Sequence, residues 1–520
     1  MRKLSKALAL SMIAAAILAS CNTKSGETNK LKEASFLLSS GAASADEFIW
    51  KGILEEKFGV KANFEMAAQS AHLEKLQLLI ASNNLPDVIS PIPSDTAKKI
   101  GIAGMLYDYN ESIDKMPDFE KIIKEDMTSY VSLLADNGAL YIAPQKTIDT
   151  NNFGFFRYIP TIREDLVKEV GMEIPQTFEE LYEVLKAIKA KHPDAVGLIN
   201  RTGTDIFKDM GYLYGTRPDV HYNFEGDKYV FGPESENYKE MLKYLNKLWK
   251  EGLADPELFT ASKTQFESKV INGLGVFFID WAEYSSTYTK THMSLLEGNK
   301  DEFLLVPIGP LTPEIYPRKI VQKMSATNDY CSMSISVNSE AKENLVEFVN
   351  WLYSEEGADV SNYGVKDEHY TVEADGKYKL KENIMADYNP DGTIERDKIY
   401  GINLPHMRRV TTNKEFSVVN EYVKKTDDIL NALRETDYPY ATNNEIVLTY
   451  TEEEIEERNT IQSDINTCVN EWSIGLVTGE KSFDDYESFI AETKKRGVDR
   501  LVEISNAAYD RLKSKRGDEK

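Results

Sequence analysis

Two hydrophobic periods alternate along the first hundred residues of the chain. Short apolar runs predict buried strands, and between them apolar residues recur every three to four positions, as on one face of an amphipathic helix. Strands and helices in this alternation are typical of a mostly parallel sheet. The predicted strands are residues 34–38, 61–66 and 87–90, and the predicted helices are residues 46–58 and 70–82.

Polar segments follow each of these strands, at residues 39–44, 67–70 and 90–95. In open α/β sheets, ligands sit beyond the carboxyl ends of the strands. We therefore expect these three segments to border a binding cleft.

The α/β pattern continues to the end of the chain. A capping box at Thr177 and Glu180 predicts the start of a helix. Gly252 predicts the end of a helix over residues 236–251. We also expect strands at 138–144, within 269–279 and at 332–337, helices at 163–170 and 340–353, a linker at 307–317, and a tail from residue 451 that is helical in three pieces, broken at 475–479 and near 497.

The N-terminus has the layout of an export signal. Basic residues precede an apolar run over residues 7–18, which is too short to cross a bilayer unaided. The run ends in Leu18-Ala19-Ser20-Cys21, which resembles a bacterial lipobox. We expect residues 1–20 to be a signal peptide, Cys21 to be lipidated, and residues 21–33 to form a flexible tether at the outer face of the cell membrane. A secretory signal with an incidental cysteine stays open as the alternative.

Composition excludes several classes of function. The formal net charge is -24, and such a field repels nucleic acid and anionic lipid. We therefore expect no nucleic-acid partner, and no membrane contact except through the N-terminal lipid. With only three cysteines, Cys21, Cys331 and Cys468, we expect neither a disulfide framework nor a metal cluster. A single Cys331–Cys468 bridge stays open.

The order of several segments resembles the extracellular solute-binding proteins of family 1. The tail is similar to the large lipoprotein branch of that family, which includes alginate-binding proteins, and maltodextrin-binding proteins share the same plan. The resemblance rests on Pro86-Asp87-Val88-Ile89, on residues 162–166, 175–181, 251–257 and 332–357, and on the tail segments 474–479, 485–486 and 507–511.

This resemblance implies an α/β fold, a two-lobed periplasmic-binding-protein-like (type II) clamshell with discontinuous lobes joined by hinge crossings. Bending at the hinge would close the lobes around a ligand. We expect lobe 1 to comprise residues 34–150 and 325–365, and lobe 2 to comprise residues 158–310 and much of 366–520 with its C-terminal helices. The expected crossings are residues 141–158, 311–330 and 363–372.

The resemblance also implies a function without catalysis or cofactor. Such a chain would be a monomer that captures a carbohydrate, an oligosaccharide above all, and presents it to the membrane permease subunits of an ABC importer. Two alternatives stay open: a surface enzyme that degrades polysaccharides, and a peptide-binding or adhesive lipoprotein.

A sugar site needs aromatic side chains for stacking and planar polar groups for hydroxyls. Trp281 follows a predicted strand, where maltodextrin-binding relatives carry a sugar-stacking tryptophan. Asp280 would accept from hydroxyls or cap a turn, and Tyr141 matches a tyrosine of the oligosaccharide branch.

Further ligand candidates come from polar positions. Ser90 and Ser94 follow the third strand, although Pro91 and Pro93 stand there in place of the family's usual aromatic and acidic residues. The remaining candidates are Asn152, Arg157, Thr204 and Arg408; for Arg408 a solvated pair with Arg409 is the alternative.

The segments that resemble metal-binding or phosphate-binding motifs depart from the required residue patterns. The acidic turn at residues 387–392 begins like a calcium loop, but Lys398 stands where the bidentate acid belongs, so an ordinary turn is favoured and a calcium site there stays open. The calcium loop of the alginate-binding branch is replaced here by Lys-His-Pro-Asp-Ala at residues 191–195. Glu480 replaces the glycine before the lysine of a phosphate loop. We therefore expect no metal site.

Overall fold

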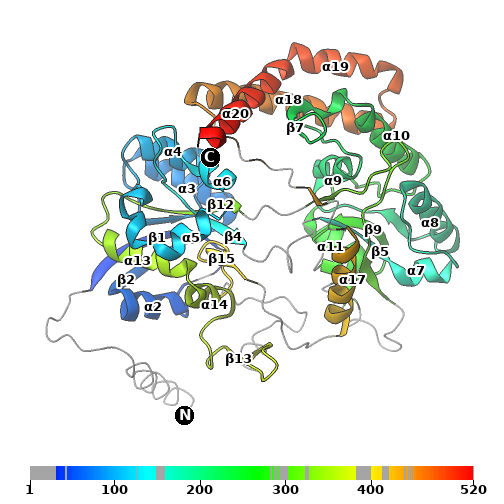
Figure 1. Ribbon diagram of the computed structural model, residues 1–520. Helices are drawn as coiled ribbons and strands as arrows, with labels where there is room; N and C mark the ends of the chain where they lie inside the picture. Colours follow the sequence, from blue (N-terminus) through cyan, green and yellow to red (C-terminus); the bar gives the residue numbers. More distant parts are fainter. Residues whose placement is uncertain are drawn as a thin grey trace.

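The protein forms two α/β lobes that lie side by side, with a layer of helices across both (Figure 1). This computed structural model describes residues 31–40, 42, 44–125, 127–147, 158–281, 303–322, 327–381, 400–412, 421–437 and 450–518, together with residues 284–285, 288–289, 292, 441–442, 446 and 448. The predicted fold class is confirmed.

Lobe 1 is built on a six-stranded sheet in the order β15-β4-β12-β3-β1-β2. Strands β1 (Lys32–Ser39), β2 (Val60–Ala67) and β3 (Val88–Ser90) are parallel, and helices α2 (Ile49–Phe58) and α3 (Gln69–Ala81) connect them. The apolar side chains of β1 are buried, as its largely apolar run over residues 34–38 predicts. The other strands are β4 (Ala143–Thr147), β12 (Thr327–Ile335), which runs antiparallel to β3 and β4, and β15 (Val410–Thr411).

Further helices of lobe 1 pack around this sheet. They include α4 (Ser94–Ile102), α5 (Pro117–Ile123), α6 (Met127–Leu133), α13 (Lys342–Tyr353) and α14 (Glu355–Tyr363). The strand expected at residues 138–144 starts later, at Ala143.

Lobe 2 has a four-stranded sheet in the order β10-β5-β9-β6. Its capping box is present: Thr177 Oγ1 accepts from the Glu180 amide at 3.1 Å, and Glu180 Oε2 accepts from the Thr177 amide at 3.2 Å. The elements are β5 (Ile159–Arg163), α7 (Glu164–Glu169), α8 (Phe178–Lys191), β6 (Val196–Leu198), α9 (Ile206–Leu213), the hairpin β7 (Val220–Asn223) and β8 (Lys228–Phe231), α10 (Glu236–Lys250), α11 (Lys263–Ile271), β9 (Gly275–Asp280) and β10 (Leu305–Pro307).

The described strands place three passages of the chain between the two lobes. The first passage runs from β4 to β5 and the second from β10 to β12. We expected the third at residues 363–372, but that position is wrong: β15 pairs with β4, so the chain is still in lobe 1 at Thr411. Helix α17 (Glu421–Asp437) then packs against β10 in lobe 2. Residues 370–380 form a small hairpin of β13 (Tyr370–Val372) and β14 (Tyr378–Leu380).

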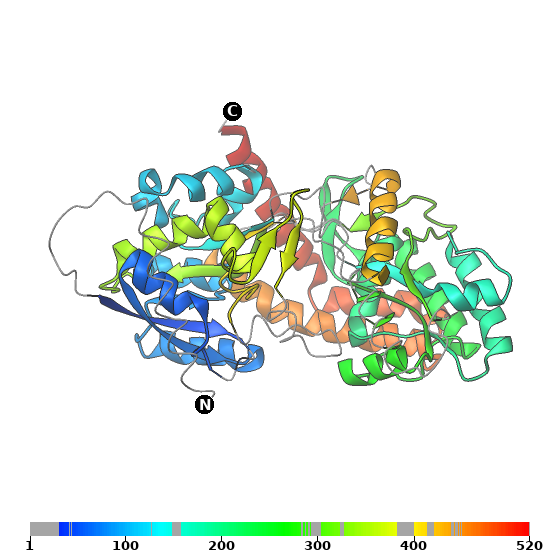
Figure 2. The same ribbon diagram turned by 90° about the horizontal axis from the view of Figure 1, so that it is seen from below.

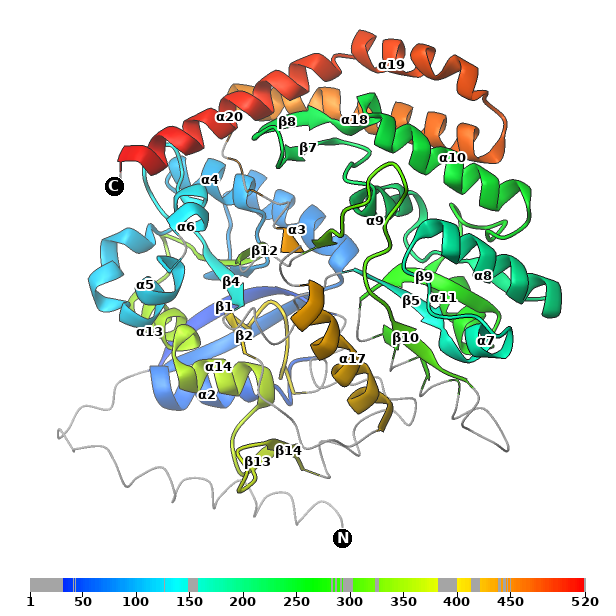
Figure 3. The ribbon, with the colours of Figure 1, turned by 45° about the vertical axis from the view of Figure 1, so that its right-hand side comes forward.

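We expected the C-terminal helices to belong to lobe 2, but they span both lobes. Helix α18 (Glu452–Thr478) packs on α10, and α19 (Tyr486–Lys495) follows the left-handed Gly479. Helix α20 (Val498–Asp518) begins against the core of lobe 2 and reaches lobe 1, where Tyr509 and Leu512 join the buried core (Figures 2 and 3). Of the described helices, none is both long and apolar enough for a membrane span.

Candidate functional site

An aromatic pair marks the edge of the lobe 2 sheet. Strand β9 ends at Asp280, and because β5 runs antiparallel to it, the start of β5 lies at the same edge, with Ile159 opposite Asp280. The flanking residues Trp281 and Tyr158 bring their ring centroids to 5.5 Å at an interplanar angle of 50°. Both side chains are half-buried. The edge therefore offers aromatic surface. Trp281 directly follows a strand, as the sequence predicts, and its contact with a ligand stays a prediction.

Asp280 is held by the protein itself. Arg201, which follows β6, donates from Nε and Nη2 to the two carboxylate oxygens at 2.7 and 2.6 Å. Asp280 Oδ1 also accepts from the Trp281 amide at 2.8 Å. A carboxylate that is 1% exposed and bound in this bidentate way orients the guanidinium. Its predicted contact with sugar hydroxyls stays a prediction, and Arg201 is the more accessible polar group.

A short loop after β6 carries both Arg201 and Thr204. Asn200 organises it by donating to the Gly203 carbonyl at 2.6 Å and to the Leu258 carbonyl at 3.1 Å. Thr204 is half-buried and lies in a short 3-10 helix, Gly203–Asp205. The Arg201 guanidinium lies 5.4 Å from the ring centroid of Tyr284. This part of lobe 2 thus gathers polar and aromatic groups at one edge.

The corresponding edge of lobe 1 is filled by its own chain. Ser90 is fully buried, and its hydroxyl donates to the His406 carbonyl at 2.6 Å. Arg408 is half-buried and donates to Asn403. The predicted alternative of a solvated arginine pair is wrong for Arg409, which is fully buried. Its guanidinium donates to the carbonyls of Ala143, Cys331, Pro405 and His406.

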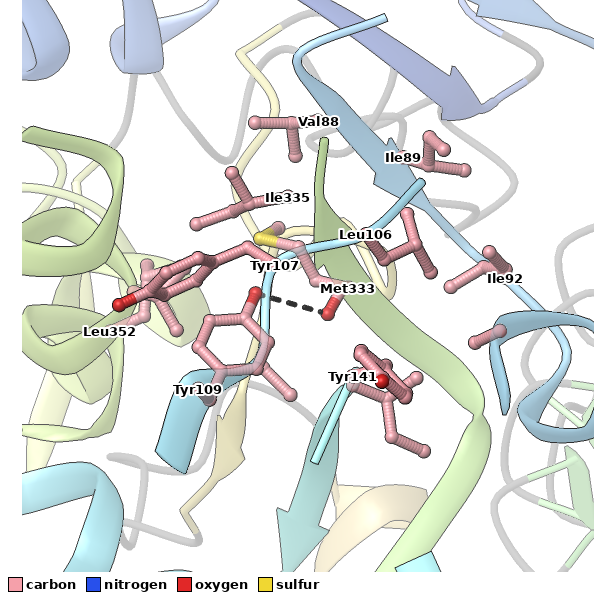
Figure 4. Close-up of a cluster of buried hydrophobic side chains, with 14 of the residues drawn as sticks. Val88, Ile89, Ile92, Leu106, Tyr107, Tyr109, Tyr141, Met333, Ile335 and Leu352 are labelled. Atoms are coloured by element: carbon pink, nitrogen blue, oxygen red, sulfur yellow. Dashed lines mark hydrogen bonds between the residues drawn. The ribbon is translucent and has the colours of Figure 1, made fainter. Parts of the chain in front are cut away.

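Tyr141 lies in the core of lobe 1 (Figure 4), and its contact with a ligand stays a prediction. Its ring packs on Gly101, where an added Cβ would lie 2.4 Å from the ring. The glycine thereby creates the hollow that the ring fills. The Tyr141 hydroxyl accepts from Asn137 Nδ2 at 2.9 Å. Three other candidates, Cys21, Asn152 and Arg157, lie outside the described residues.

A cavity of about 530 Å³ opens where lobe 1, the β7–β8 hairpin and α18 meet. Of the predicted ligand residues that the structure describes, Ser94 lines the cavity, and Trp281, Asp280, Tyr141, Ser90, Thr204 and Arg408 do not. Asp95 also lines it, and both Ser94 and Asp95 belong to the segment 90–95 that we expected at a cleft. The other polar or aromatic lining residues are Arg217, Asp219, His221, Tyr222, Tyr229 and Tyr330, with Tyr450, Arg458, Gln462 and Asn466 on the side of α18.

The cavity presents groups suited to binding. The Ser94 hydroxyl is buried and has no hydrogen-bond partner among the described residues. Burial raises the pKa of Tyr229 and of Tyr450, so both keep their hydroxyl protons at neutral pH. Burial lowers the pKa of His221, which leaves its imidazole neutral. The lining therefore combines neutral hydroxyl and amide groups with four tyrosine rings.

Two other expectations concern cysteines and metals. Cys331 in β12 and Cys468 in α18 are both buried, and no disulfide joins them. In the described part of the chain, no group of three or more His, Cys, Asp or Glu side chains is placed to hold a metal ion.

Sequence reasoning missed Arg201, Tyr158 and Arg458. Tyr158 stood in a visible aromatic cluster, and Arg201 follows a strand that ends at the same edge as Trp281. Arg458 carried no local signal, because its surroundings on α18 are a run of charged residues.

Comparison with known proteins assigns the family. The family model described as bacterial extracellular solute-binding protein matches residues 38–359. A fructooligosaccharide ABC transporter substrate-binding protein, FusA of Streptococcus pneumoniae, is 24% identical over 98% of each chain. Lipoprotein LipO of Bacillus subtilis is 25% identical over 74% of this chain and 77% of its own.

A solved structure shares the fold. It is an HMO-binding, ABC-transporter-associated solute-binding protein from Bifidobacterium longum infantis, with a TM-score of 0.74 and 17% identity, covering 92% of this chain and 98% of that chain. The two lobes, the cavity where they meet and the match over residues 38–359 lead to one conclusion: the chain belongs to the bacterial extracellular solute-binding protein family.

Proposed function

We propose that this protein captures an oligosaccharide outside the cell and delivers it to an ABC importer, without catalysis of its own. The observation that carries the proposal is the cavity at the junction of the lobes, with its tyrosine rings and its buried Ser94 hydroxyl. Sugars need an aromatic platform for their C–H faces and hydrogen-bonding groups for their hydroxyls, and the cavity supplies both. The similarity to FusA supports the same substrate class.

In this proposal, residues of both lobes contact the ligand. On lobe 2, Trp281 and Tyr158 would stack on a sugar ring while Arg201, oriented by Asp280, donates to hydroxyls. On lobe 1, Ser94 and Asp95 would complete the contacts when the hinge closes. Thr204 and Arg408 stay candidates at the rims, and Asn152 and Arg157 stay candidates on the first crossing.

The N-terminal segment has a role in this proposal. A lipid on Cys21 would keep the binding protein at the membrane surface, near its permease, and the polar residues 22–32 would let the lobes turn toward it. A single acyl chain binds membranes only weakly, so stable anchoring needs more than one chain. Similarity to a lipoprotein, LipO, supports this part of the proposal.

Calorimetric titration with a panel of defined oligosaccharides tests the proposal. The mature chain without the lipid is titrated with each glycan, and the mixtures are then analysed for cleavage products. We expect at least one glycan to bind with a one-to-one stoichiometry and to be recovered intact. Cleavage at catalytic rates would establish the enzyme alternative, and the absence of binding to any glycan would favour the peptide-binding or adhesive one.

A further inference from the structure

One arginine of the cavity has an unusual environment. Arg458 lies on the α18 wall, and its guanidinium is 4.5 Å from the ring centroid of Tyr450. Both side chains are half-buried and both line the cavity. A guanidinium stacked on an aromatic face keeps its in-plane N–H donors available for a further partner.

Two of the acids close to Arg458 on α18 are bound to other arginines. Glu454, one helical turn before it, accepts from Arg511 Nη1 at 2.9 Å. Glu457 accepts from Arg500 Nε and Nη2 at 2.8 and 2.9 Å. Among the described residues, no carboxylate forms an ion pair with Arg458.

The other charges of the cavity are largely compensated. Arg217 makes a bidentate pair with Asp219, at 2.9 and 2.8 Å. Asp95 lies in the first turn of α4, where the exposed amides of the helix favour a negative charge. His221 adds no charge at neutral pH, because burial lowers its pKa. Arg458 is therefore the cavity cation with no direct carboxylate partner in the described chain.

We propose that this cavity recognises an acidic oligosaccharide, a glycan of hexuronate units, and that Arg458 binds one of its carboxylates. This inference rests on the proposed function. The guanidinium can form two parallel N–H···O bonds with a carboxylate, and Tyr450 holds its plane in position. The tyrosines and amides of the lining bind the sugar rings and hydroxyls that acidic and neutral glycans share.

The net charge of the protein does not oppose this assignment at short range. The chain carries a formal charge of -24, which repels an anion at a distance. At physiological ionic strength, however, charges beyond about 8 Å are screened. A direct contact with Arg458 lies well within that range, so local pairing decides the preference.

The test compares ligands that differ only in charge. Trigalacturonate and trimannuronate are titrated beside their methyl esters, which keep the sugar rings and hide the carboxylates. The protein variants are wild type, Arg458→Gln, Arg458→Lys and the control Lys495→Gln, which removes a positive charge from an exposed position on α19. Melting temperatures without ligand report whether each variant is folded.

We expect wild type to bind at least one free acid more tightly than its ester. Arg458→Gln should weaken binding of the acid roughly 10- to 100-fold, as for the loss of a charged hydrogen bond, and leave the ester unchanged. Arg458→Lys should recover only part of the loss, and Lys495→Gln should bind like wild type.

Other outcomes overturn the inference in different ways. If Arg458→Gln keeps the preference for the acid, a different residue binds the carboxylate. If neutral glycans of the wider panel bind and both uronates do not, the acidic class is wrong while the proposed function stands. If no glycan of either kind binds, the proposed function itself fails.

Discussion

The two lobes treat the edges of their sheets in opposite ways. At the lobe 1 edge, Ser90 and Arg409 are fully buried and donate hydrogen bonds to carbonyls of the same lobe. At the lobe 2 edge, Trp281 and Arg201 stay half-buried, and Asp280 behind them is fully enclosed. A polar residue at the end of a strand is therefore not by itself a ligand residue: what matters is whether the chain has already supplied its partner.

The largest effect should come from lobe 1. Arg409→Met keeps much of the side-chain volume but removes the donor to four carbonyls, of which that of His406 keeps the Ser90 hydroxyl. Each unsatisfied group costs about 1–3 kcal/mol, so we expect the free energy of unfolding to fall by about 3 kcal/mol or more. Urea unfolding followed by circular dichroism measures it. Arg318→Met, at an exposed ion pair, should change it by less than about 1 kcal/mol. A loss at Arg409 as small as that of Arg318 would contradict the structural role.

Lobe 2 offers a matched pair of Arg–Asp contacts at opposite ends of one sheet. Asp280→Asn should lower the free energy of unfolding by about 2 kcal/mol and also weaken glycan binding, because Arg201 loses its anchor. Asp165→Asn breaks the similar pair with Arg163, at the far end of β5, and should cost stability alone. Calorimetry and urea unfolding of both variants give the comparison. If the Asp280→Asn and Asp165→Asn variants bind the glycan with equal affinity, Arg201 does not contact the ligand.

Trp281→Ala separates binding from stability. We expect glycan affinity to fall by about 1–3 kcal/mol, as for an aromatic residue at the centre of a binding site. The free energy of unfolding should change little, since the ring is half-buried. Trp249→Ala is the control, because Trp249 is also half-buried, stacks on Phe259 at a ring distance of 5.9 Å within lobe 2, and should leave glycan affinity unchanged. Unchanged affinity in the Trp281 variant would exclude its ring from the ligand contact.

The smallest effect concerns two serines, Ser90 at the end of β3 and Ser94 at the start of α4. Ser90→Ala removes one internal hydrogen bond and should lower the free energy of unfolding by about 1 kcal/mol, with glycan affinity unchanged. Ser94→Ala removes a hydroxyl that faces the cavity without an internal partner, and should weaken affinity by about 1 kcal/mol instead. Titration and urea unfolding of both variants give the comparison. A larger loss of glycan affinity in Ser90→Ala than in Ser94→Ala would place the ligand nearer Ser90.

Local patterns in the sequence were enough to predict most of the helices and strands. The strands and helices before residue 91 and the capping box of α8 follow from periodicity and from side-chain chemistry within a few residues. The third crossing did not, because β15 has two residues and no periodicity to read.

The candidate site depended on long-range contacts. Arg201 and Asp280 are 79 residues apart in the chain, and no local pattern pairs them. Tyr141 had the expected residue type and neighbours, but Gly101 opens a hollow in the core that draws its ring inward. The cavity combines α4, the β7–β8 hairpin and α18, so its lining emerges only once the lobes and the C-terminal helices are assembled.

The central claim is that the two lobes close around a glycan, and a distance between the lobes tests it most directly. Spin labels on Leu78→Cys in α3 and Leu274→Cys before β9 report that distance by double electron–electron resonance. Both positions are exposed, whereas Cys331 and Cys468 are buried. With a saturating amount of the glycan that binds most tightly in the calorimetric panel, we predict a shorter and narrower distance distribution. An unchanged distribution at full occupancy would contradict capture by lobe closure.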